Sequence, residues 1–123
     1  PVVGFSFIAP ESGWVLVHTQ GRLESNNNTI IGLLSWQIRE GSTVASGTVV
    51  YNSTQADADE ASLVSGPNVT AGGASLVTPS GMWPRSLDPG ETFNISLIHR
   101  ATGSSIDIFN RQVMVFPLID MDQ

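Results

Sequence analysis

ETFNISLIHR, residues 91–100, is the stretch of the chain that decides the fold. Its apolar residues Phe93, Ile95 and Leu97 alternate with small polar ones, and this period of two is typical of a β-strand with one face against a core. No window of about 12 or more residues shows a helical period anywhere in the chain. We expect the polar side chains of this strand to point outward: Thr92, Asn94 and Ser96.

Similar segments recur between Gly, Pro, Asn and Ser residues. The other expected strands are 4–9, 14–20, 30–39, 44–51, 61–64, 74–77, 106–109 and 112–119. Segment 14–20 is apolar in both of its alternating sets, which predicts a central strand that is covered on both faces. About eight or nine short strands predict an all-β, antiparallel β-sandwich, either of the jelly-roll or of the immunoglobulin-like kind.

Length and composition predict one domain, residues 1–123. Residues 52–89 are rich in Ser, Ala, Gly and Asp and predict a long, loop-rich excursion, in which 55–62 has a short helix as its alternative. Residues 119–123 form a short acidic tail. Because the chain has no long apolar run and no signal-peptide pattern at its start, we expect a soluble protein away from membranes, not exported by a cleaved signal unless this sequence is already mature.

The cysteine content and the charge of the chain exclude several kinds of site and partner. The chain has no Cys, so disulfides, thiol catalysis and Cys-type zinc sites are excluded. It carries five basic residues against 11 acidic ones, a net charge of −6, and therefore cannot build the basic patch that nucleic acid needs.

Candidate catalytic groups are few. His18 and His99 both lie within expected strands, where a surface or half-buried His is commoner than an acid–base catalyst. Neither a G-x-S-x-G elbow nor an H-E-x-x-H metal motif is present. Asp57, Asp59 and Glu60 lack the pattern of a calcium loop and read as a solvated acidic segment. We therefore predict a protein that is not an enzyme and has no cofactor and no metal.

The aromatic residues suggest contact surfaces. Trp14 and Trp36 fall in apolar strands and are expected in the core, whereas Trp83 lies in a turn-rich stretch beside Met82 and Arg85, a group typical of interface anchors. Capping of the sandwich end is the equally weighted alternative for Trp83. The expected interface residues are Phe5, Phe7, Met82, Trp83, Arg85, Phe116, Leu118 and Ile119.

The segment Leu87-Asp-Pro-Gly-Glu-Thr-Phe93 resembles the L-x-P-G-x-x-Y corner of fibronectin type III and other immunoglobulin-like sandwiches. Leu87 is expected to plug the end of the core, Pro89 and Gly90 to reverse the chain, and Phe93 to start the strand. Because Phe93 replaces Tyr, the hydrogen bond of a tyrosine corner is absent. Jelly rolls contain similar corners, so this motif leaves the topology open.

A second resemblance covers residues 5–118. The order F-x-F-x-A-P-x-S-G-W-V-L-V, I-R-E-G, L-x-P-G-E-T-F, H-R and R-Q-V-x-V-x-P-L is similar to small β-sandwich virion proteins of tailed bacteriophages. This resemblance implies a capsid decoration or tail protein, often trimeric, and we expect this chain to be a homo-oligomer, with a trimer as the expected state. We therefore expect a cement subunit in the virion, made in the host cytoplasm, which binds the major capsid protein or other virion proteins through 1–7, 52–89 and 116–123. The alternative is a carbohydrate- or receptor-binding module on a phage tail or a bacterial surface protein.

Overall fold

The computed structural model describes residues 2–25, 32–52, 63–65, 75–77, 80–101 and 106–119. These residues form strands, turns and irregular segments, and none of them is helical. The strands are β1 (Gly4–Ile8), β2 (Trp14–Ser25), β3 (Gly32–Glu40), β4 (Val49–Asn52), β5 (Leu63–Ser65), β6 (Ser75–Val77), β7 (Ser80–Ser86), β8 (Thr92–Ala101) and β9 (Ile106–Pro117). The predicted all-β fold is confirmed. The alternative helix at 55–62 and the acidic residues Asp57, Asp59 and Glu60 lie outside the described residues.

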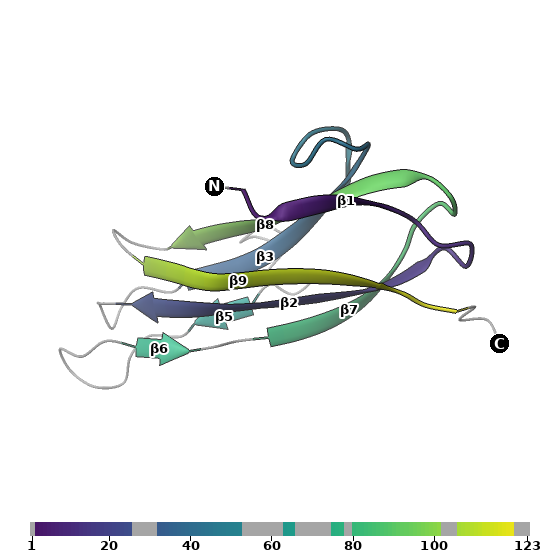
Figure 1. Ribbon diagram of the computed structural model, residues 1–123. Coiled ribbons are helices and arrows are strands. Elements are labelled where there is room, and N and C mark those ends of the chain that lie inside the picture. The colour runs from purple at the N-terminus through teal and green to yellow at the C-terminus, as the bar shows by residue number, and fades with distance from the viewer. Residues whose placement is uncertain are drawn as a thin grey trace.

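The strands form two antiparallel sheets (Figure 1). In the first sheet β8 lies between β1 and β3, and the far edge of β3 pairs with β4 and β5. In the second sheet β2 is central, with β9 along one edge and with β7 and β6 along the other. This position confirms that 14–20 belongs to a central strand.

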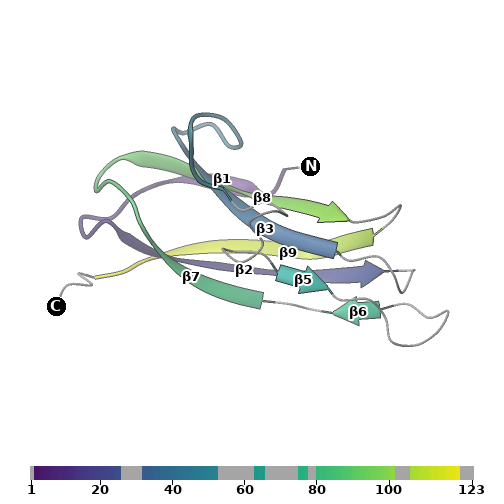
Figure 2. The ribbon, with the colours of Figure 1, turned by 180° about the vertical axis from the view of Figure 1, so that it is seen from behind.

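The two sheets share one apolar core, as a β-sandwich requires. It contains Val15 and Val17 of β2 and, from the first sheet, Leu34, Trp36, Ile38, Phe93, Ile95 and Leu97. The hydroxyl of Tyr51 on β4 donates to the carbonyl of Ser86 on β7 at 2.7 Å, which joins the two sheets along one side. Figure 2 shows β7 and β3 from this side.

Strand β8 has the predicted alternation, but some of its outward side chains are buried as well. Phe93, Ile95 and Leu97 are buried in the core as expected. Asn94 and Ser96 point to the opposite face but are also buried, and the segment 41–48 covers Asn94 there. The outward direction of Thr92, Asn94 and Ser96 is as predicted, and of the three only Thr92 is exposed.

The 87–93 corner forms as predicted. Glu91 N–H donates to the carbonyl of Asp88 at 3.3 Å, and Gly90 has a φ of 77°. Pro at the second and a left-handed Gly at the third position define a type II turn. Leu87 is buried at the end of the core, and its N–H donates to the carbonyl of Gly13 at 2.7 Å.

Three predicted boundaries were wrong. Of the expected strand 44–51 only the last three residues lie in a strand, β4 (Val49–Asn52). Residues 80–86, predicted as loop, form β7, because an edge strand tolerates Gly81 and Pro84 where a central strand does not.

The expected strands 106–109 and 112–119 are one strand, β9. Two residues, Asn110 and Arg111, stand opposite Gly21 alone, and Asn110 has a φ of 54°. This is a β-bulge, which accounts for the apparent break in the sequence pattern.

Candidate surface for binding

The outer face of the second sheet carries a group of apolar side chains that we call the docking face. On β2, Val15 and Val17 point into the core, so Trp14, Leu16 and His18 point outward. Directly opposed residues share a face. Leu16 is opposed by Pro84 of β7 and Phe116 of β9, and His18 by Met82 and Met114. The docking face comprises Trp14, Leu16, His18, Met82, Pro84, Met114 and Phe116.

This face is open to solvent in the described part of the chain. Met82 is 60% exposed, Phe116 43% and Met114 38%. Trp14, Leu16 and His18 are half-buried between the flanking strands. The prediction that β2 is covered on both faces was therefore wrong for the described residues, and Trp14 was wrongly predicted to lie in the core.

The docking face carries no carboxylate, although the chain has 11 acidic residues. Its polar neighbours are Gln20, Ser80 and Gln112 at one end, followed by Arg22 on the same face of β2, and Ser86 opposite Trp14 at the other end. An apolar centre with Met and aromatic residues, few charges and a polar rim is the composition of a protein–protein interface.

The expected interface residues fall into two groups. Met82 and Phe116 lie together on the docking face, and Ile119 is 86% exposed beyond the end of β9. Leu118 is half-buried, where its N–H donates to the carbonyl of Trp14 at 2.9 Å. Phe5 and Phe7 instead point inward from β1 and pack against the core.

Trp83 lies in strand β7 and not in a loop. Its ring is half-buried, packs against the core and lies 6.0 Å from the ring of Trp36. Arg85 follows on the same side of β7, with its guanidinium carbon 5.3 Å from the Trp36 ring centroid and 5.5 Å from that of Tyr51. These contacts close one side of the sandwich, in keeping with the capping alternative for Trp83, and Trp36 is buried in the core as predicted.

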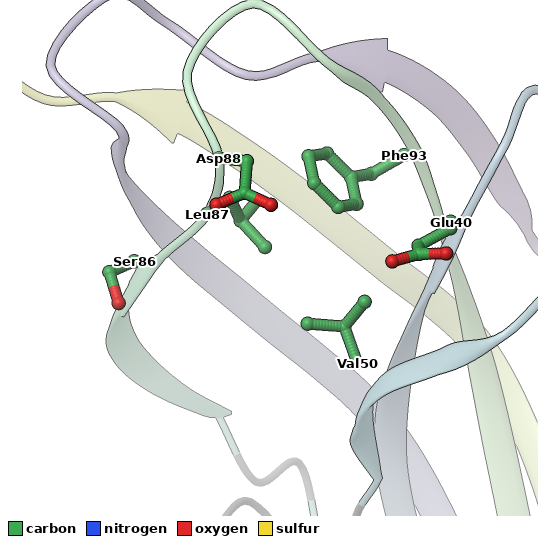
Figure 3. A pocket seen from close by; sticks show the side chains of 6 residues that line it. All are labelled: Glu40, Val50, Ser86, Leu87, Asp88 and Phe93. Atoms are coloured by element: carbon green, nitrogen blue, oxygen red, sulfur yellow. The ribbon is translucent and has the colours of Figure 1, made fainter.

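A pocket of about 310 Å³ lies at the end of the sandwich, beside the 87–93 corner (Figure 3). Its lining residues are Glu40, Val50, Ser86, Leu87, Asp88 and Phe93. Leu87 and Phe93 are core residues, whereas the carboxylates of Glu40 and Asp88 are on exposed residues. Neither His18 nor His99 lines this pocket.

The described residues contain no group of three or more His, Asp or Glu side chains that could hold a metal ion. They also contain no helix that is long and apolar enough to span a membrane. His18 lies on β2 and His99 on β8, both within strands as predicted.

Comparisons with family models, with curated proteins and with solved structures gave no match for this chain.

The sequence indicated two members of the docking face, Met82 and Phe116, but missed Trp14, Leu16 and Met114. These three lie in strands whose two alternating sets are both apolar, so alternation alone does not say which set faces the core. The cross-strand register supplies the missing information, because it aligns Leu16 with Phe116 and His18 with Met114.

Proposed function

We propose that this protein is a structural binding subunit that attaches to other virion proteins through its docking face, as a capsid decoration or cement subunit does. The observation that carries the proposal is the open, uncharged apolar face of β9, β2 and β7 on a chain with a net charge of −6. Exposed apolar surface of this kind costs free energy in water, and burial against a partner recovers it.

The partner that fits this face is a protein surface with an apolar centre. Phe116, Met114 and Met82 project as separate side chains, and each can enter a shallow pocket of a shell protein. Met side chains adapt to irregular surfaces, which suits a subunit that contacts many equivalent but not identical sites. The polar rim then excludes water around the centre.

Of the two topologies left open by the sequence, we propose the jelly roll. Strands β1 and β2 lie in different sheets, whereas the first two strands of an immunoglobulin-like sandwich share one sheet. The chain also pairs β1 with β8 and β2 with β7, a nested order expected from the Greek keys of a jelly roll.

A shell-binding experiment tests the function. The purified chain is mixed with expanded capsid shells of the phage that encodes it, and bound protein is measured after sedimentation. We expect saturable, stoichiometric binding and a higher temperature of shell disruption. Absence of binding at saturating protein overturns the cement assignment, and a positive glycan array in its place supports the carbohydrate-binding alternative.

A pair of matched variants tests the surface. Met82→Lys places a charge in the docking face, where burial removes its hydration, so shell affinity should fall at least tenfold. Ile8→Lys is the control, because Ile8 is 68% exposed, close to the 60% of Met82, but lies on β1 of the other sheet. Equal binding by both variants and the unmodified chain contradicts attachment through this face.

A further inference from the structure

The free edges of the two sheets differ in how they are protected. β4 has four residues, β1 has five, and β5 and β6 have three each. β7 has seven residues but contains Pro84. β9 has 12 residues, and among the described residues no strand pairs with its second edge. Long unpaired edges invite pairing with another chain, and proteins usually shorten or block them.

The backbone groups on each free edge follow from the hydrogen bonds. Leu118 N–H donates to the carbonyl of Trp14, so this opposed pair is of the hydrogen-bonded type. Pairs alternate in type along an antiparallel ladder. Val113 and Val115 are therefore in non-bonded pairs with β2, and their N–H and C=O groups point to the free edge.

The same alternation explains why β7 is blocked. Leu87 N–H donates to the carbonyl of Gly13, so Gly13 and the odd-numbered residues of β2 face β7. Pro84, opposite Leu16, then lies at a position whose N–H would point outward, and Pro has none. The run 112–116 of β9 offers consecutive outward groups without a Pro or a charged side chain, and it lies in the longest described edge strand. The edge of β1 also lacks Pro and charge, but β1 has only five residues.

We propose that two copies of this chain pair through β9, antiparallel and about a two-fold axis at Met114. In this register Val113 of one copy and Val115 of the other exchange both backbone hydrogen bonds. The two Met114 side chains meet in the non-bonded pair at the axis. The second sheets of the two copies then form one continuous sheet, and their docking faces join.

The second copy is favoured as the occupant by charge and by geometry. Two chains of net charge −6 repel each other, and residues 112–118 carry no charge, so approach along this run adds little repulsion. The described edge of β9 has 12 residues, and the β9 of a second copy offers an edge of equal length, whereas β1 offers five residues. Such a contact is the same on both copies and closes at two.

The size of the contact sets its strength. The five residues 112–116 of β9 extend about 17 Å, and the sandwich is about 20 Å thick with its side chains, so each copy loses about 340 Å² of surface. A stable interface of standard size needs about 800 Å² per partner. We therefore expect a reversible dimer that forms at about 10–100 µM, and a higher occupancy wherever neighbouring binding sites concentrate the copies.

Sedimentation equilibrium of the full chain over about 1–300 µM tests this inference, because the range brackets the expected dissociation constant. The mass should rise from 13.1 kDa toward twice that value, 2 × 13.1 = 26.2 kDa. A mass that stays at the monomer value throughout overturns the proposal. A limiting mass of three chains also overturns it and supports the trimer that the phage resemblance implies.

Single cysteines locate the contact, because the chain has none of its own. Met114→Cys should form a disulfide-linked dimer on mild oxidation, since Cα atoms in a non-bonded pair lie about 4.5 Å apart. Met82→Cys is the matched control: it lies on the same face, also opposite His18, but on β7. Linkage of Met82→Cys as fast as that of Met114→Cys shows pairing through the face and overturns pairing through the edge.

This inference does not rest on the proposed function. The mass and the cross-links are measured on the free protein, without shells, so either proposal can fail alone.

Discussion

Replacement of Asn94 by Ala should destabilise the fold more than any other substitution of a polar residue on the outer face of the first sheet. Asn94 is fully buried, and its amide joins β8 to the segment 41–48. Its Nδ2 donates to the carbonyls of Gly41 at 3.0 Å and Ser46 at 3.1 Å, and its Oδ1 accepts from Ala45 N–H at 3.0 Å. A further contact to the carbonyl of Arg39 is long, at 3.4 Å.

The magnitude follows from these bonds. A hydrogen bond contributes about 1 kcal/mol net, so loss of the three short ones costs about 3 kcal/mol. If the segment 41–48 lifts, water can reach the backbone groups that have lost their partner. The loss of stability is then smaller, with about 2 kcal/mol as its lower limit. Out of a total stability of about 5–15 kcal/mol this is a large share, and we expect Tm to fall by roughly 8–10 °C.

Urea and thermal unfolding followed by circular dichroism measure the effect. Ser6→Ala is the control, because Ser6 pairs with Asn94 across β1 and β8 but is exposed, and its replacement should change stability by no more than about 0.5 kcal/mol. Hydrogen exchange adds a local measurement: the Ala45 amide should lose its protection in Asn94→Ala. A loss of stability below about 0.5 kcal/mol, with Ala45 still protected, would refute the reasoning.

Other substitutions test the core, the turns and the closure of the sandwich. Leu34→Ala removes a fully buried side chain and should cost about 3–4 kcal/mol, measured by the urea midpoint. Gly90→Ala should cost about 1 kcal/mol, because its φ is positive but its Cβ would meet no atom within 4 Å. Gly13→Ala should cost clearly more, since its Cβ would lie 2.8 Å from the carbonyl oxygen of Leu87, and equal midpoints for the two Gly variants contradict this turn geometry. Tyr51→Phe loses the 2.7 Å bond between the sheets and should lower stability by about 0.5–1 kcal/mol in thermal unfolding, whereas an unchanged Tm shows that water replaces this bond at no cost.

The direction of the side chains in a strand was predictable where every second residue is polar. In β8 the polar set marks one face, so the inward direction of Phe93 and Ile95 follows from the pattern alone. The corner was predictable because Pro89 and Gly90 have backbone requirements that few other turns share. Burial of Asn94 was not predictable, because it depends on the return of 41–48 over the sheet, a contact between distant parts of the chain.

Strand β7 and the docking face needed three-dimensional information. Gly81 and Pro84 argue against a strand in a central position, and sequence alone does not show that β7 is at an edge. The docking face exists only because β7 and β9 flank β2 in a register that aligns Met82, His18 and Met114. Its members come from three strands that are far apart in the sequence.

Met82 and Met114 together separate the two proposed surfaces. Both oppose His18 on the same face, but Met114 also borders the free edge of β9, whereas Met82 lies beside the blocked edge of β7. A charge at either position disturbs a partner that sits on the face, so both Lys variants should lose shell binding. A charge at Met114 alone brings two like charges together at the two-fold axis, so Met114→Lys should remain monomeric while Met82→Lys still forms the dimer. Loss of the dimer in both variants implies that one surface, the face, serves both contacts, and that the long edge of β9 is not used.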